Sequence, residues 1–404
     1  MSNAAYGLLG APLAMAALPL FVQLPAYYAT HLGVALAPLG GVLFAARLID
    51  MLQDPLLGYL LDRAQAQRRR WMALGAAALA LAFAALWLPP PAVAPGAWLA
   101  LMLVLAYGAH SLVNIAYLSW GARLPSALGP VAWREGMGLA GMLAASLIPA
   151  AILAADAAQV RPRLGAYSIG YALLLLIAMF ALLRHAPSPA TSGDSGSGGN
   201  EVNSWRDTVR EVAGNRALRL LLAPYFINAL AVAIPATLAL FYIDDQLGAP
   251  HLAGIFLACY FGAAACGLPV WTALARKLGP LKCWRLGMLL SVLGFCGAAL
   301  LGTGDLLPYA AVCIAAGAAL GADLALPPVL LAAALGERLG PGTGFGLFTL
   351  LGKLALALAG LSLPLLAWLG YQPGAGGGTH LLLAYAVLPC LLKLLAIATL
   401  RSPT

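Results

Sequence analysis

Long apolar segments recur along the whole chain, and they constrain the fold more than any other feature of the sequence. A helix of about 20 apolar residues is long enough to cross a lipid bilayer. Here such segments are separated by Gly, Pro or Arg, and 62% of the 404 residues are hydrophobic whereas 9% are charged. The pattern predicts an all-α polytopic membrane protein with about twelve spans. We expect them at roughly 6–30, 37–62, 71–90, 97–124, 134–157, 166–184, 218–244, 251–275, 281–303, 307–335, 342–370 and 380–400.

The net charge of +8 follows from basic residues at alternate loops. The loops between these basic loops lie on the other side of the membrane. Among them, only the loop between the fifth and sixth spans carries basic residues, Arg161 and Arg163. Because positive loops stay in the cytoplasm, we expect both termini there and no nucleic-acid partner. The residues behind this prediction are Arg63, Arg68, Arg69, Arg70, Arg123, Arg184, Arg206, Arg210, Arg216, Arg276, Lys277, Lys282, Arg285, Arg338 and Arg401.

A stretch rich in Ser, Gly and Pro at 187–204 lies at the midpoint of the chain. It predicts a linker, followed by a short polar helix at 205–217. Residues 267–279 also echo residues 58–70, as parallel repeats of about six spans would. We therefore expect two six-helix bundles, 1–186 and 218–404, joined by a cytoplasmic segment at 187–217.

The second expected span carries acids at bilayer depth. Asp50 and Asp54 are four residues apart, so they share one helix face, and Arg47 lies one turn earlier on the same side. A charge at this depth costs roughly 2.5–3.5 kcal/mol, so such acids indicate an ion or proton pathway. Where this span ends, Gly58 permits close helix contact, and Asp62 and Arg63 predict a charge network at the cytoplasmic edge.

The fourth expected span has a polar stripe at three- and four-residue steps, formed by Tyr107, His110, Ser111, Asn114 and Tyr117. One face of that helix is therefore wet or hydrogen-bonded. For His110 a packing role and a functional role both remain open. Asn114, at mid-span depth, is a candidate for binding a solute.

Three further residues are candidates. Arg134, at the start of the fifth span, is either an interfacial anchor or a cation that reaches a substrate anion or an acid of the second span. Asn228 gives the seventh span a polar face. Lys353 lies too deep in its apolar segment to reach either end, so it needs a carboxylate or a polar cavity.

Two expectations concern the end of the chain. Asp323 in the tenth span is followed by Pro327 and Pro328, which we expect to break the helix near the acid. Lys393 lies in the last turns of the twelfth span, where we expect it to extend toward the membrane surface.

The pattern R-x-x-D-x-x-x-D-P-x-x-G at 47–58 resembles the glycoside-pentoside-hexuronide:cation symporters of the major facilitator superfamily. The resemblance covers nearly the whole chain. It also rests on Tyr6-Gly7, on Asn114 to Ser119, on Arg134, on Phe241-Tyr242, and on Gly336-Glu337-Arg338 leading to Lys353.

The resemblance implies a major facilitator fold and a bacterial inner-membrane symporter driven by Na⁺ or H⁺, without a cofactor and acting as a monomer among membrane lipids. It places Asp50, Gln53, Asp54 and Ser111 at the cation site, with the two acids as Na⁺ candidates, and Lys353 near those acids. The resemblance and the residue patterns together assign coupling to Lys353 and Arg47, and conformational gating to Gly58, Asp62 and Arg63. The residues expected to bind the solute are Asn114, Arg134, Tyr117, His110 and Asn228.

Some positions depart from the family's melibiose carrier. The first span has no acid, Asn114 stands where that carrier has an aspartate, Leu118 replaces an aromatic residue, and 330–335 lacks the usual acids. The departures argue against a galactoside. We expect a symporter of a small organic solute of the sugar or glycoside class. A lysophospholipid or other amphiphile carrier and an uncoupled uniporter or exporter stay open, whereas the absence of a nucleophile–base pair argues against an enzyme.

Overall fold

The computed structural model describes residues 3–64, 67–124, 128–153, 155–187, 205–335, 339–372 and 376–400. These residues form helices and connecting turns, and no strand occurs among them. The predicted linker falls outside the described residues from 188 to 204, and so do Gly336, Glu337 and Arg338.

The chain divides into two compact units. Unit 1 comprises Met1–Ser197 and Gly340–Leu347, and unit 2 comprises Gly198–Leu339 and Phe348–Thr404. Unit 1 contains α1 (Asn3–Gly7), α2 (Gly10–Thr30), α3 (Leu36–Arg63), α4 (Arg68–Trp87), α5 (Pro95–Ala122), α6 (Leu128–Leu153) and α7 (Ala157–His185). Helix α13 (Pro341–Gly360) begins in unit 1 and ends in unit 2.

Unit 2 contains the remaining elements. They are α8 (Trp205–Gly214), α9 (Arg216–Phe241), η2 (Tyr242–Gln246), η3 (Pro250–Leu252), α10 (Ala253–Leu278), α11 (Pro280–Ala298), α12 (Leu306–Ala334), α14 (Ser362–Trp368), α15 (Thr379–Leu382), η4 (Leu383–Val387) and α16 (Leu388–Thr399). η2 and η4 are π-helical turns, and they bring Tyr242 and Tyr385 into a ring stack with centroids 4.1 Å apart.

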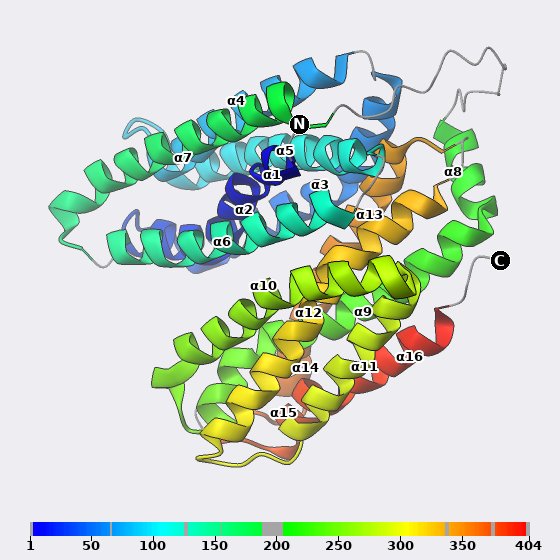
Figure 1. The fold of residues 1–404 in the computed structure, drawn as a ribbon. Coiled ribbons are helices and arrows are strands. Elements are labelled where there is room, and N and C mark those ends of the chain that lie inside the picture. Colours follow the sequence, from blue (N-terminus) through cyan, green and yellow to red (C-terminus); the bar gives the residue numbers. More distant parts are fainter. Residues whose placement is uncertain are drawn as a thin grey trace, which may run out of the picture. The chain divides into compact units, whose positions relative to one another are not determined.

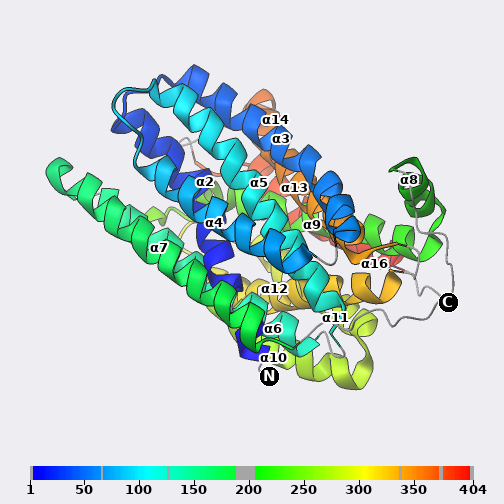
Figure 2. The ribbon, with the colours of Figure 1, turned by 90° about the horizontal axis from the view of Figure 1, so that it is seen from above.

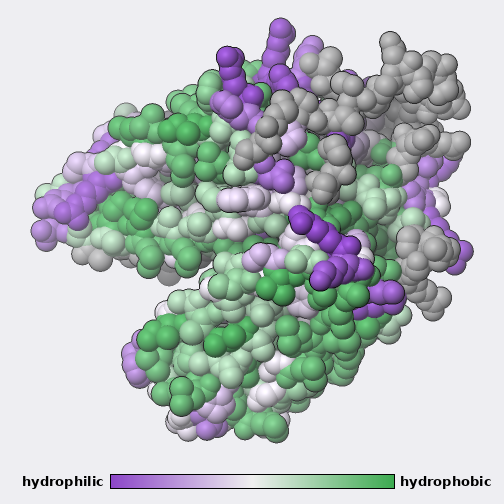
Figure 3. All heavy atoms as spheres, viewed as in Figure 1, coloured by the Kyte–Doolittle hydropathy of each residue, from purple (hydrophilic) through white to green (hydrophobic). Residues whose placement is uncertain are grey.

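Ten helical segments of the described residues are long and apolar enough to cross a membrane. Two more helices, α2 with 21 residues and α3 with 28, lie at the first two expected spans. In the face shown in Figure 3, hydrophobic residues cover the middle of the helices and hydrophilic residues gather toward their ends. The prediction of an all-α polytopic membrane protein is confirmed.

Within unit 1, α5 packs against both α3 and α4, while α6 covers α1 and α2 (Figure 1). Figure 2 shows α5, α4 and α7 side by side, in agreement with their contacts. Some of these contacts need glycine. A Cβ at Gly141 of α6 would collide with the backbone of Ala11 on α2, so these two helices approach closely only without that side chain.

Within unit 2, α12 lies between α10 and α11, and α9 packs on α16. Gly317 of α12 rests on the backbone of Tyr260, and Gly321 rests on that of Ala264. The expected break at Pro327 and Pro328 was wrong, since α12 continues to Ala334 with both prolines buried. A proline removes one helix hydrogen bond, and the flanking helices of a membrane bundle hold the segment in place.

Candidate functional site

The two acids of the 47–58 motif are among the most buried charged groups of unit 1. α3 carries both, one turn apart, with Asp50 4% exposed and Asp54 0% exposed. Oδ1 of Asp50 accepts hydrogen bonds from Nε2 of Gln53 at 3.2 Å and from the Ser111 hydroxyl at 3.1 Å. The structure therefore brings three of the four predicted cation-site residues into contact.

Helix α5 supplies the opposite wall of this site. Ser111 is 3% exposed and faces α3, and Gly108 lies one turn earlier on the same helix. A Cβ at position 108 would come within 3.3 Å of Oε1 of Gln53, so the glycine makes room for the amide. One residue of the polar stripe predicted on this span, Ser111, therefore contacts an acid of α3.

A guanidinium lies near the acids of α3. Arg47 interacts electrostatically with Asp50 and with Tyr107. Beside the two carboxylates, the side chains of Gln53 and Ser111 add an amide oxygen and a hydroxyl oxygen. Carboxylate, amide and hydroxyl oxygens are the ligands that hard cations prefer. Among the described residues no three His, Cys, Asp or Glu side chains come together.

A second polar contact of unit 1 lies where α3 ends. The Asp62 carboxylate accepts hydrogen bonds from the backbone N–H of Gly342 at 2.8 Å and from the N–H and hydroxyl of Thr343 at 2.6 and 2.8 Å. It thereby caps the first turn of α13, where unpaired N–H groups favour a negative charge. Burial lowers the pKa of Arg123, and the nearby Asp62 carboxylate acts in the opposite direction.

Glycines make this contact between α3 and α13 possible. A Cβ at Gly58 would collide with the carbonyl of Gly342, and a Cβ at Gly342 would collide with the carbonyl of Gly58. The guanidinium of Arg63 lies over the ring of Tyr59, 5.1 Å from its centroid. Of the three predicted gate residues, Gly58 and Asp62 therefore contact the start of α13.

The predicted solute-binding residues of unit 1 lie in different surroundings. His110 makes a hydrogen bond of 3.1 Å with the carbonyl of Leu13 on α2, and Asn114 is half-buried. The Tyr117 hydroxyl donates to the carbonyl of Tyr6 at 2.6 Å, with the rings 4.5 Å apart. Tyr117 is thus fully engaged in packing α5 against α1.

Arg134 lies six residues inside α6 and is 9% exposed. Its Nε donates to Oε1 of Glu135 at 2.8 Å, and the two side chains form an ion pair. The partner of the Arg134 guanidinium is therefore an acid on the same helix, Glu135.

Asn228 belongs to a different polar cluster, in unit 2. Its Nδ2 donates to Oδ1 of Asp323 at 3.0 Å, and its Oδ1 accepts from Nζ of Lys393 at 2.8 Å. Nζ of Lys393 also lies 2.7 Å from Oδ2 of Asp323, and Nε1 of Trp284 donates to Oδ1 at 2.9 Å. We call these four residues the Asp323 cluster.

The expectation that Lys393 extends toward the membrane surface was wrong. Its side chain is 4% exposed, because the carboxylate of Asp323 and the amide of Asn228 draw the ammonium group into the unit. The sequence contained a signal: Asn228, Asp323 and Lys393 lie in three apolar spans of the same half, and such residues need partners there. Lys353, in contrast, is half-buried on the part of α13 that belongs to unit 2.

Comparison with known proteins places the chain in a family. The family model described as MFS/sugar transport protein matches residues 4–402. The chain belongs to this family. The resemblance inferred from the 47–58 motif is thereby confirmed, and the protein is a member of a transporter family.

One curated relative of this MFS/sugar transport protein is the inner membrane symporter YicJ of Escherichia coli, 22% identical over 286 residues. The match covers 66% of the chain but 59% of the relative's length.

Solved structures show the same fold. The Escherichia coli fucose:proton symporter FucP superposes with a TM-score of 0.72 at 15% identity, covering 100% of this chain and 97% of that one. A bacterial homologue of the iron transporter ferroportin gives 0.70 at 16% identity, over 99% and 98% of the two chains. The proton:xylose symporter XylE gives 0.68 at 13% identity, over 99% and 94%. The major facilitator fold is therefore shown.

Proposed function

We propose that the protein is a symporter that couples the flow of Na⁺ or H⁺ to uptake of a small organic solute of the sugar or glycoside class. The family and the fold support a transporter, and the relative YicJ is named a symporter. The observation that carries cation coupling is the pair of buried carboxylates on α3, with Gln53 and Ser111 bonded to Asp50. Transport proceeds by alternating access in the bacterial inner membrane, with both termini in the cytoplasm.

In this proposal Asp50, Gln53, Asp54 and Ser111 bind the cation. A bound cation neutralises part of the negative charge and favours the state that takes up the solute, because a ligand shifts an equilibrium toward the state it binds better. Arg47, which interacts with Asp50, and Lys353 serve as coupling residues that hold the acids ionised when the cation leaves.

The same proposal assigns gating to Gly58, Asp62 and Arg63. The hydrogen bonds from α13 to Asp62 are released and remade as the protein changes state. Solute binding is assigned to His110, Asn114, Arg134 and Asn228, with Tyr117 supporting them through its contact with Tyr6.

Uptake into proteoliposomes tests the proposal. The labelled probes are methyl glucoside, xylose and glucuronate, each offered with an inward Na⁺ gradient, an inward H⁺ gradient or no gradient. We expect at least one probe to accumulate above its external concentration under one gradient. Asp50→Asn removes one carboxylate charge from the site, so it abolishes accumulation while the purified protein stays folded and monodisperse.

A matched control is Asp244→Asn, which removes a carboxylate from an exposed position in η2 and leaves accumulation unchanged. Full accumulation in Asp50→Asn would contradict the cation assignment. Entry of a probe that only equilibrates, with no response to either gradient, would identify an uncoupled uniporter.

A further inference from the structure

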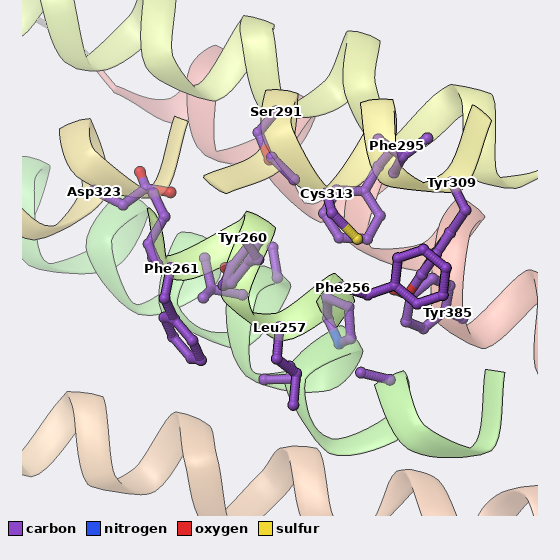
Figure 4. A pocket seen from close by; sticks show the side chains of 18 of the residues that line it. Phe256, Leu257, Tyr260, Phe261, Ser291, Phe295, Tyr309, Cys313, Asp323 and Tyr385 are labelled. Carbon is purple, nitrogen blue, oxygen red and sulfur yellow. The ribbon is translucent and has the colours of Figure 1, made fainter. Parts of the chain in front are cut away.

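A cavity of about 130 Å³ lies wholly inside unit 2, between α9, α10, α11, α12 and α16. In Figure 4, Asp323 lies at one end of this cavity, and Tyr309 and Tyr385 lie at the other. Asp323 and Tyr309 are fourteen residues apart on α12, which corresponds to roughly 21 Å of helix. The cavity is therefore elongated, with a charged end and an aromatic end.

The walls between the two ends are apolar. α12 contributes Val312, Ala316 and Leu320 at helical spacing, and Phe295 faces them from α11. At the aromatic end the hydroxyls of Tyr309 and Tyr385 bond each other at 2.7 Å, so one of them donates and the other accepts. In this section of the cavity, a bound molecule would contact ring faces and methyl groups.

Three hydrogen bonds reach the Asp323 carboxylate at the charged end. Oδ1 of Asp323 receives two hydrogen bonds, from Asn228 and Trp284, and Oδ2 receives the ammonium group of Lys393. The opposite charges of Asp323 and Lys393 cancel. An occupant that brought a further charge into this buried setting would have no partner to balance it, which is unfavourable in a low-dielectric interior.

Donors, in contrast, are left over. The ammonium group of Lys393 has three N–H bonds, and its contacts with the described residues use two of them. Ser291 and Tyr260 also line the cavity, and each carries a hydroxyl that can donate. The charged end can therefore donate hydrogen bonds to an occupant that carries an acceptor.

We propose that this cavity is a binding site for a small neutral molecule with one apolar ring or short alkyl chain and one hydrogen-bond-accepting oxygen. The oxygen accepts from the Ser291 hydroxyl, with Lys393 and Tyr260 as the other donors at this end, and the apolar part lies along α12 toward Tyr309. The size agrees, since an apolar protein cavity of about 150 Å³ accommodates benzene. The site is separate from the proposed cation site on α3 and does not depend on it.

Fluorine NMR of the full-length protein in lipid nanodiscs tests the proposal. The probe is 4-fluoroacetophenone, whose carbonyl is the acceptor. Two matched probes are 4-fluorocumene, which has nearly the same shape without the oxygen, and the anion 4-fluorobenzoate. We expect saturable binding of the ketone, at least about tenfold weaker binding of 4-fluorocumene, and no binding of the anion.

Variants locate the binding. Ala316→Trp fills the cavity and abolishes binding, whereas Leu307→Trp, at an 84% exposed position of the same helix, leaves it unchanged. Ser291→Ala removes one donor at little cost in volume, so it weakens binding roughly three- to tenfold. This variant decides the matter if Ala316→Trp does not fold.

Equal binding by wild type and a folded Ala316→Trp would overturn the proposal, as would unchanged affinity in Ser291→Ala. Equal affinities for the ketone and 4-fluorocumene would show that no donor is used, and tight binding of the anion would show that the site is not neutral. Asp50→Asn, which removes the proposed coupling, leaves the affinity of the ketone unchanged, so failure of one proposal is distinguishable from failure of the other.

Discussion

Helices α3 and α12 both carry buried carboxylates, but different kinds of side chain donate hydrogen bonds to them. On α12, Asp323 accepts the ammonium group of Lys393, which lies in the same unit. On α3, Asp50 accepts from the neutral side chains of Gln53 and Ser111. Asp323 thus has an ammonium group as a direct partner, whereas Asp50 is bonded by two neutral side chains and also interacts with the guanidinium of Arg47. In our proposal the acids of α3 are the ones that bind and release a cation.

The comparison also explains why the two acidic sites have different consequences for stability. Removing a partner from a buried ion pair leaves an uncompensated charge. Removing a neutral donor costs one hydrogen bond and leaves the charge as it was. The stability of variants of α3 and α12 can therefore distinguish an acid that stabilises the fold from acids that bind a ligand.

Lys393→Met has the largest expected effect on stability. The buried carboxylate of Asp323 loses its counter-charge, and we expect a loss of roughly 3–5 kcal/mol in the free energy of unfolding, measured by denaturant titration in detergent. The double variant Lys393→Met, Asp323→Asn removes the uncompensated charge and regains part of that loss. A single variant as stable as wild type would break the contrast between the two helices.

Gly58→Ala tests the close contact of α3 with the start of α13. The added Cβ collides with the carbonyl of Gly342, so the helices must separate, at a cost of roughly 1–3 kcal/mol. Gly136→Ala is the control, because no atom lies within 4 Å of a Cβ there, and alanine is the better helix former by roughly 0.5–1 kcal/mol. Thermal unfolding of the two variants should move in opposite directions; a shift of the same sign would contradict the contact.

Ser111→Ala removes a donor from the Asp50 carboxylate. A hydrogen bond to a charged group contributes about 1.5 kcal/mol or somewhat more, and we expect that loss of stability in the absence of added cation. Ser119→Ala is the matched control on the same helix, because its hydroxyl donates to the carbonyl of Ile115 in its own helix. If both variants lose the same stability, the Ser111 hydroxyl has no special relation to the acid.

Asp62→Asn has the smallest expected effect. The amide keeps one acceptor oxygen, so either Gly342 or Thr343 loses its acceptor, and the negative charge is lost as well, at a cost of about 1 kcal/mol. Amide hydrogen exchange at Gly342 and Thr343 should become faster. Asp156→Asn is the control, since Asp156 precedes α7 without a side-chain cap hydrogen bond to the described residues; equal changes in exchange at the starts of α13 and α7 would argue against the cap.

Much of this arrangement was predictable because it follows from spacing within a helix. The four-residue step from Asp50 to Asp54 placed both acids on one face, and the polar stripe of α5 indicated that Ser111 faces polar surroundings. These are local relations, and a helix has a fixed period. The all-α fold was equally predictable from apolar segments of membrane-spanning length.

The Asp323 cluster was not predicted, because its members come from four helices. Asp323 and Lys393 are 70 residues apart, and their contact depends on how α12 and α16 pack. Because Lys393 is near the end of its helix, we expected its side chain to extend toward the membrane surface. In the structure the side chain extends toward Asp323 on α12 instead. The same holds for Asp62, since nothing in residues 58–70 indicates that the carboxylate caps a helix that begins at Pro341.

A thermal-shift titration tests the central claim most directly, because it needs no knowledge of the solute. Purified wild type and Asp54→Asn are compared in NaCl and choline chloride at constant ionic strength and at several pH values. A cation that binds the folded protein stabilises it, by about 2.7 kcal/mol at 100 times its Kd. We predict that Na⁺, or protons alone, raises the Tm of the wild type and that this response disappears in Asp54→Asn. The same response in both proteins, or no response to Na⁺ or pH in either, would contradict a cation site on α3.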